Sequence, residues 1–232
     1  MALRDRMFAL APTRRARAAI AALALAFLAL AALVAAGVFT SLDQFSLDHL
    51  MPWLVPGSPA GSATAGFYRP FTLHSATAIK ILDLWTYPCS VLVSGLVVGV
   101  ACLVLWRRLG TVAALAPAAA WVIGNAVEVV GKHVIVRPAV YGTANGVRIH
   151  VTAFDDSFPS GHMLRGVLVA GAIVLVWKRA APWALFWVVL VGPALVLQAA
   201  HTITDVVGGA IVGVMLLVPV FALVHAPEPS TR

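Results

Sequence analysis

The sequence predicts an all-α membrane protein, a single bundle of six transmembrane helices with both termini in the cytoplasm. Of the 232 residues, 61% are hydrophobic and 11% are charged, whereas a soluble domain carries about 45–50% apolar and about 25% charged residues. The mean hydropathy is +0.95. This composition excludes an ordinary soluble domain, and the length suits one compact domain over residues 1–232.

Six apolar segments are long enough to cross a bilayer, which takes about 20 residues of helix. The first has an apolar run from Ala18 to Val38, longer than the roughly 7–15 residues of a cleaved signal peptide. We therefore expect it to remain as a helix. In chain order, the expected spans are 16–39, 84–106, 110–131, 162–178, 182–201 and 205–225.

Lysine and arginine are distributed unevenly between the loops, which predicts the orientation because cytoplasmic loops are enriched in both. Residues 1–15 are expected in the cytoplasm, and the segments 40–83 and 132–161 are expected to face the periplasm or exterior of a cell (inner) membrane. This topology also explains the net charge of +7 without nucleic acid as a partner. The ten basic residues of the richer side are Arg4, Arg6, Arg14, Arg15, Arg17, Arg107, Arg108, Lys178, Arg179 and Arg232.

The outward segment 40–83 is unusually apolar for a loop. Pro56 and Gly57 mark turns, whereas Trp53 and Phe67 are large apolar side chains. Such a segment either lies on the membrane surface or forms part of a lid or substrate entrance. The alternative is a loop that packs against the bundle, and both interpretations stay open at this point.

Polar residues inside a membrane are costly, and here they are concentrated at one depth. The outward ends of the third to sixth expected spans all carry them. This distribution predicts one shared polar site at the outward end of the bundle. Its members are Glu128, Lys132, Arg137, Ser160, His162, Arg165, His201 and Asp205.

The strongest local signal is Pro159-Ser160-Gly161-His162, which opens the fourth span. Ser160 can cap the helix, Gly161 lets a ligand approach the backbone, and free amides at a helix N-terminus bind phosphate. His162 on the first turn can then donate a proton to a leaving oxygen. The alternative is a capped helix with a histidine at the membrane interface.

The second signal is the pair His201 and Asp205, four residues apart and therefore on one face if the stretch is helical. The carboxylate can accept the proton of one ring nitrogen, which leaves the other nitrogen free to attack phosphorus. The alternative is an interfacial pair that merely ends the fifth span.

The third signal is Lys132 with Arg137, at the end of the third span. Cations there would bind phosphate oxygens and stabilise the charge on a transferring group. Glu128 lies one turn before Lys132 and can hold it in place. The alternative is snorkelling of both basic side chains to the interface.

Together, these elements resemble the motifs of the type-2 phosphatidic-acid phosphatase superfamily: a lysine followed by Arg-Pro, then Pro-Ser-Gly-His, then Ser-Arg, a histidine and an aspartate. The resemblance implies that His201 is a nucleophile that forms a phosphohistidine, that Asp205 orients it, and that His162 is the general acid. It implies neither metal nor other cofactor, and a phosphate site of Lys132, Arg137, Ser160 and Gly161. The implied substrate is a lipid phosphate or diphosphate, with a polyprenyl diphosphate such as undecaprenyl diphosphate as the first choice.

Two positions depart from that pattern. Ala139-Val140 stand where the family has its Arg-Pro, and Ala194-Leu195 stand where it has Ser-Arg. Arg165, one turn after His162, can replace the missing arginine because it shares that helical face. The alternative is a structural Arg165 that pairs with Glu128, Asp155 or Asp156. Further polar residues that we expect to be structural are His133, Arg148, His150 and Gln198.

Other functions could use the same residues. A phosphotransferase would pass the phosphoryl group to a second lipid, and a non-catalytic relative would only bind lipid phosphates. A transporter is disfavoured because the polar residues gather at one end and do not line a path through the bilayer. Gly209 and Gly213 permit close helix packing within one chain or between chains, so the oligomeric state is not predicted.

Overall fold

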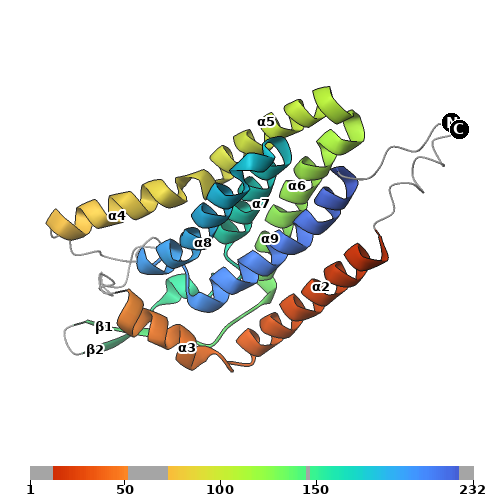
Figure 1. The fold of residues 1–232 in the computed structure, drawn as a ribbon. Helices are drawn as coiled ribbons and strands as arrows, with labels where there is room; N and C mark the ends of the chain where they lie inside the picture. The colour runs from red at the N-terminus through yellow and green to blue at the C-terminus, as the bar shows by residue number, and fades with distance from the viewer. Residues whose placement is uncertain (1–12, 52–72, 145–146, 225–232) are drawn as a thin grey trace, which may run out of the picture.

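The computed structural model describes residues 13–51, 73–144 and 147–224, which form a helical bundle (Figure 1). The six longest helices run side by side, and each runs in the opposite direction to the one before it in the chain. Arg4, Arg6 and Arg232 lie outside the described residues, as does the stretch 52–72 of the expected outward segment. The six are α2 (Arg14–Ala35), α5 (Val91–Leu109), α6 (Thr111–Val134), α7 (Gly161–Val176), α8 (Ala181–Leu197) and α9 (Ile203–Val224).

Among the described residues, five helices are long and apolar enough to cross a membrane: α2, α5, α6, α9, and α8 with the short turn η4 (Lys178–Ala180) before it. The fourth expected span is α7, which is apolar but has only 16 residues. A helix of that length covers about 24 Å, less than the hydrocarbon core of roughly 30 Å. The count of six spans therefore depends on α7 and stays a prediction. This helix is the centre of the bundle, packed against α5, α6, α8 and α9.

The expected outward loop is helical where the structure describes it. The second long helix begins at Val91 rather than at residue 84, because Pro88 lies in a separate turn and Ser90 caps the new helix. The Val93 amide donates to the Ser90 hydroxyl at 3.4 Å. The elements before it are α3 (Thr40–Phe45), the π-helical turn η1 (Ser46–Leu50), α4 (Leu73–Thr86) and the 3-10 turn η2 (Tyr87–Cys89).

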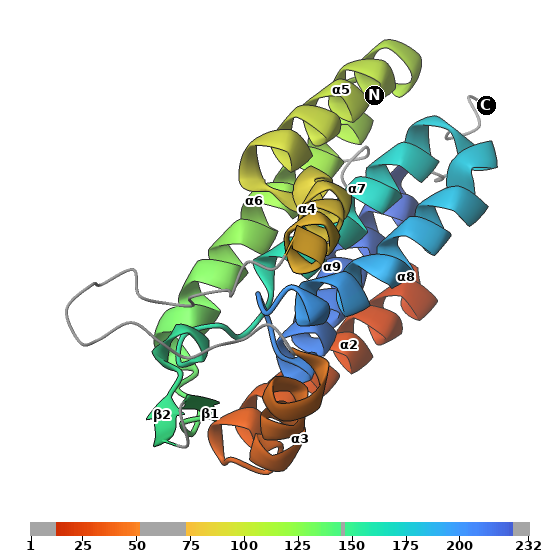
Figure 2. The same ribbon diagram turned by 90° about the vertical axis from the view of Figure 1, so that its left-hand side faces the viewer.

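A β-hairpin departs from the all-α prediction. Strands β1 (Tyr141–Ala144) and β2 (Val147–His150) pair antiparallel, with Tyr141 opposite His150. Gln44 ties the hairpin to α3, since its side-chain amide donates to the Tyr141 carbonyl at 2.6 Å and its oxygen accepts from the Tyr141 amide at 2.9 Å. The hairpin and α3 thus lie together at one end of the bundle (Figure 2).

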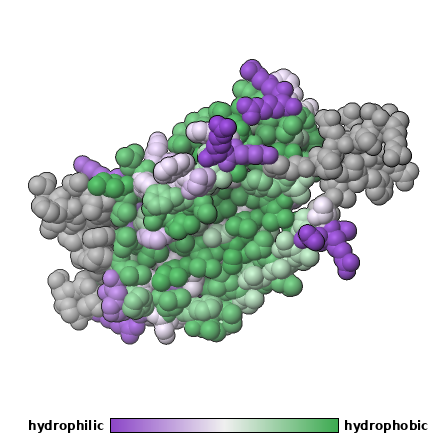
Figure 3. Space-filling model, viewed as in Figure 1, coloured by the Kyte–Doolittle hydropathy of each residue, from purple (hydrophilic) through white to green (hydrophobic). Residues whose placement is uncertain are grey.

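The flank of the bundle is largely apolar between its two ends, as Figure 3 shows for one face. At the end opposite the hairpin, the Arg108 guanidinium donates to the Val176 carbonyl at 3.1 Å, which joins the last turns of α5 and α7. Lys178 and Arg179 follow at once. The basic end and the hairpin end are therefore separated as the predicted topology requires, while the side that faces the cytoplasm stays a prediction.

Two glycines of α9 bring that helix close to α7. A Cβ added to Gly209 would come within 2.3 Å of the Ser160 carbonyl oxygen, and one added to Gly213 would come within 2.7 Å of Val167. The small-residue pair found in the sequence thus packs within this chain. Its effect is to hold the N-terminal half of α9 against the N-terminal half of α7.

Candidate active site

The polar residues predicted to form one site come from three chain segments that meet at the hairpin end of the bundle. These segments are the last turns of α6 with the stretch that follows it, the N-cap and first turns of α7, and the residues that lead into α9 with its first turn. The Ser160 amide donates to the Asp205 carbonyl at 3.0 Å, which fastens the second of these segments to the third. Ser160 also caps α7 as expected, because its hydroxyl accepts the Met163 amide at 3.2 Å.

The two histidines face each other across this junction. Their ring centroids are 6.3 Å apart. His201 Nδ1 lies 3.4 Å from Asp205 Oδ2, and the Thr202 amide donates to the same oxygen at 3.0 Å. A carboxylate can only accept a hydrogen bond, so it favours the tautomer that carries the proton on Nδ1. Nε2 of His201 then keeps its lone pair, and the second ring of the pair belongs to half-buried His162.

Arg137 lies behind Asp205, buried in a network of side chains. Its guanidinium donates to Asp205 Oδ1 at 2.8 Å and to the Ser157 hydroxyl at 3.0 Å, and it forms an ion pair with Asp43. These contacts fix the carboxylate that faces His201. We predicted Arg137 at the phosphate; its observed partners are those of a residue that holds Asp205, and phosphate binding by Arg137 stays a prediction.

Asp43 is a member of the site that the sequence did not reveal. It lies on α3, 94 positions before Arg137, and only 2% of it is exposed. Its carboxylate also accepts the Thr204 hydroxyl, with 2.8 Å to Oδ2. Burial raises the pKa of Asp43, and the Arg137 charge and the Thr204 hydrogen bond oppose that rise. The only sequence signal was a carboxylate placed in an apolar stretch.

Glu128 links the two other cations of the site. Its carboxylate pairs with Lys132 Nζ at 2.8 Å and with Arg165 Nη1 at 2.5 Å. It also lies directly over the start of α7, because a Cβ added to Gly161 would come within 1.9 Å of the Glu128 carboxyl carbon. Two cations therefore share one carboxylate at the N-terminus of α7, and a helix N-terminus is a place where anions bind well.

Arg165 adopts the pairing with Glu128 that the sequence left open as an alternative. Its Nη1 also donates to the Asn125 side chain at 2.9 Å, and its Nε donates to the Cys89 carbonyl at 2.8 Å. Asp155, one of the two other partners considered, pairs with His150 instead. Arg165 and Lys132 pair with different oxygens of the Glu128 carboxylate, which lies against Gly161. A role for both cations in phosphate binding stays a prediction.

The position of the missing Ser-Arg is filled by core residues. Leu195 is fully buried and packs in a cluster with Met163 and Val191, while Ala194 is also buried. The four residues expected to be structural have partners of their own: His133 contacts Val129, His150 contacts Asp155, Arg148 lies over Tyr141, and Gln198 contacts Thr86.

Metal binding finds no ready set of ligands in the part of the chain that the structure describes. There, no group of three or more His, Cys, Asp or Glu side chains lies close enough to hold an ion. The roles expected for the two histidines, a nucleophile and a general acid, stay a prediction.

A model of the PAP2 superfamily matches residues 63–228. The structure is similar to the crystal structure of the first transmembrane PAP2 type phosphatidylglycerolphosphate phosphatase from Bacillus subtilis, with a TM-score of 0.58 and 18% identity over 92% of this chain and 98% of that one. A search of curated proteins found no match. The structural likeness shows a common fold, and the family match covers all three motifs.

Proposed function

Because the chain belongs to the PAP2 superfamily, it is a membrane phosphoric ester hydrolase, and we propose that it removes phosphate from a lipid phosphate or diphosphate through a phosphohistidine on His201. The observation that carries this proposal is the pair of facing histidines, of which one is held by a buried carboxylate. A histidine so oriented has the lone pair that nucleophilic catalysis needs.

The first step is an in-line displacement at phosphorus. Nε2 of His201 attacks, the bond between phosphorus and the lipid oxygen breaks, and protonated His162 gives its proton to that oxygen. Asp205 stabilises the positive charge that develops on the ring of His201. The products of this step are the free lipid alcohol, or the lipid monophosphate from a diphosphate, and the phosphohistidine.

The second step returns the enzyme to its starting state. Neutral His162 takes a proton from water, the water oxygen attacks phosphorus, and the bond from phosphorus to Nε2 breaks. Lys132 and Arg165, with the backbone amides at Ser160 and Gly161, stabilise the oxygens of the phosphoryl group in both steps. Arg137 contributes through Asp205, which it holds in place.

The proposed substrate is a polyprenyl diphosphate such as undecaprenyl diphosphate, with the site facing the periplasm from a cell (inner) membrane. The separation of the basic end from the site end supports this orientation under the positive-inside rule. The apolar flank of the bundle supports a substrate that stays in the bilayer while its headgroup reaches the site.

The decisive experiment measures phosphate release by the purified protein in detergent with a chelator present. Undecaprenyl diphosphate and phosphatidic acid are compared, with and without vanadate, for the wild type and for His201→Ala. We expect release that vanadate inhibits and that the variant lacks. An acid-labile phosphorylated protein should accumulate on rapid quenching of the wild type. Equal release by wild type and His201→Ala would rule out the proposed nucleophile.

A second candidate, a relative that binds lipid phosphates without hydrolysing them, is favoured by the state of the cations. Leu195 occupies the place of the family's arginine, and Glu128 neutralises part of the charge of Lys132 and Arg165. Vesicle binding that depends on the lipid phosphate, with no release of phosphate from either lipid, would support this candidate. Transfer of label to an added lipid alcohol would instead indicate a phosphotransferase.

A further inference from the structure

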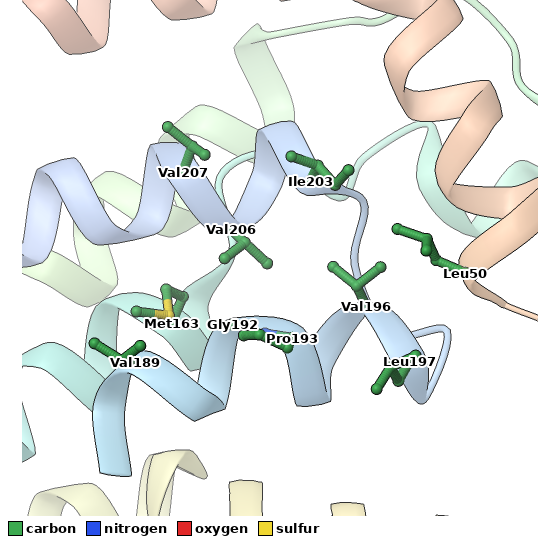
Figure 4. Close-up of a pocket in the computed structure, with 10 residues that line it drawn as sticks. All are labelled: Leu50, Met163, Val189, Gly192, Pro193, Val196, Leu197, Ile203, Val206 and Val207. Atoms are coloured by element: carbon green, nitrogen blue, oxygen red, sulfur yellow. The ribbon is translucent and has the colours of Figure 1, made fainter. Parts of the chain in front are cut away.

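An apolar cleft lies between α8 and α9, next to the proposed active site (Figure 4). Its volume is about 510 Å³, within the range of roughly 300–1,000 Å³ typical of ligand sites. Every residue that lines it is apolar, a glycine or a proline. The side chains of this lining can form no hydrogen bonds with a ligand. The cleft therefore suits a hydrocarbon and disfavours a polar molecule.

The cleft opens sideways. Val189 on α8 and Val207 on α9 stand at its edges with 59% and 43% of their surface exposed. Met163 and Val196 form its interior and are buried. Because α8 and α9 are both long enough to span the membrane, these exposed edges face the region of the lipid chains.

The walls of the cleft are continuous with the catalytic residues. Met163 directly follows His162 in the first turn of α7, and Ile203 and Val206 lie on either side of Asp205 in α9. Gly192 of α8 completes the floor, since a Cβ there would come within 3.1 Å of Val206. A chain in the cleft therefore runs beside the same two helix starts that carry His162 and Asp205.

We propose that this cleft holds the hydrocarbon chain of the lipid substrate and thereby selects long-chain over short-chain phosphates. The proposal rests on the proposed phosphatase function. The phosphoryl group would lie between His162 and His201 while the chain leaves sideways between α8 and α9. Occupancy buries apolar surface on both partners, and each buried methylene strengthens binding. A short or soluble phosphate ester lacks that contribution and reaches the site without filling the cleft.

The kinetic test narrows the cleft with Val189→Trp and Val207→Trp. Two matched controls carry the same change outside it: Val122→Trp on α6, where the valine is 59% exposed, and Val214→Trp on α9, where it is 44% exposed. Dioleoyl and dioctanoyl phosphatidic acid are assayed in one detergent. We expect the cleft variants to raise KM for the dioleoyl lipid by about tenfold, with dioctanoyl hydrolysis unchanged. Both controls should match the wild type. Equal effects on both lipids, or equal effects of controls and cleft variants, would overturn the proposal.

A second measurement needs no catalysis, so it separates failure of the cleft from failure of the phosphatase assignment. A phosphatidic acid with a diazirine on a long acyl chain is irradiated in phosphatidylcholine vesicles that contain the full chain. Labelled peptides are then mapped by mass spectrometry. Labelling concentrated between residues 189 and 207, lost in Val207→Trp and kept in Val214→Trp, supports the cleft as the chain site even if no phosphate is released. Labelling spread evenly over the lipid-facing helices α5 and α6 would refute it.

Discussion

Two clusters of charged side chains flank the histidine pair, and their net charges have opposite signs. Behind His201, two carboxylates share one arginine: Asp43 and Asp205 both pair with Arg137. Over the start of α7, two cations share one carboxylate: Lys132 and Arg165 both pair with Glu128. With all groups ionised, the first cluster carries a net charge of −1 and the second a net charge of +1.

The difference matches the two charges that the proposed reaction handles. The negative cluster lies next to the ring that becomes positive when His201 attacks phosphorus, and the positive cluster lies where an anionic phosphate would bind. The first cluster is buried and its donors are satisfied within the protein. In the second, the side chain of Lys132 is 31% exposed, so an incoming anion can reach it. Changes in the first cluster should therefore lower the rate of chemistry, and changes in the second should alter phosphate affinity.

The largest effect should come from Asp205→Asn, which breaks the first cluster at its centre. An amide cannot favour the Nδ1 protonated tautomer of His201 as a carboxylate does. We expect kcat to fall on the order of 10³–10⁴-fold, as for the aspartate of a serine protease triad. Single-turnover kinetics on undecaprenyl diphosphate measure this effect. Thermal unfolding of the variant is the control, because loss of one partner from a buried ion pair costs about 3–5 kcal/mol. A folded variant with activity within tenfold of the wild type would contradict the role of Asp205.

The next effect should come from Arg165→Ala in the second cluster. A hydrogen bond to a charged group contributes about 1.5–3 kcal/mol, so we expect the inhibition constant of vanadate to rise about 10–100-fold. Arg165→Lys, which keeps the charge, should lie between this variant and the wild type. Unchanged activity and vanadate affinity in Arg165→Ala would return Arg165 to a purely structural role with Glu128.

A smaller effect is expected from Asp43→Asn, which acts on His201 only through Arg137 and Asp205. Coupling between members of one network is typically about 0.5–3 kcal/mol, so we expect kcat to fall about tenfold with KM unchanged. Gln44→Ala on the same helix is the matched control, since it loosens the contact with the hairpin without touching Arg137. A rise in KM without a loss of kcat would mean that Asp43 affects substrate binding and not the rate of chemistry.

The smallest effect, and the only gain, is expected from Glu128→Gln. Glutamine keeps the shape of the side chain but removes its negative charge. Lys132 and Arg165 then attract an anion more strongly. We expect vanadate to bind several-fold more tightly, because a negative charge beside the anion site is removed, and product release to slow accordingly. Isothermal titration with vanadate measures the first effect. Weaker vanadate binding would mean that Glu128 positions the cations and does not compete with phosphate.

The helices and the three motifs were predictable because each leaves a local pattern. A run of about 20 apolar residues has few alternatives to a spanning helix, and Ser160 caps α7 because a short polar side chain satisfies a free amide. The later start of α5 at Val91 and the β-hairpin were missed. The stretch around Pro88 is apolar on both sides of the turn, so hydropathy alone could not divide it.

The contacts of the charged residues were harder to predict because they join distant parts of the chain. Asp43 has no motif, and its partner Arg137 is 94 positions away. For Arg165 the sequence left several structural partners open, and the packing of α6 against α7 decides which carboxylate lies near it. The spacing of Lys132 and Arg137 likewise suggested one shared site, whereas the end of α6 at Val134 separates their partners.

The location of Asp43 also has a consequence for where this protein can be divided. The family match begins at residue 63, yet α2 and α3 precede it and contribute to the region around the site. Phe27 of α2 stacks on Phe158, next to Pro159, with ring centroids 5.9 Å apart, and α3 supplies the second carboxylate of Arg137. A fragment cut at the boundary of the recognisable domain would lose both supports. The N-terminal helices therefore support the candidate active site although the family match does not include them.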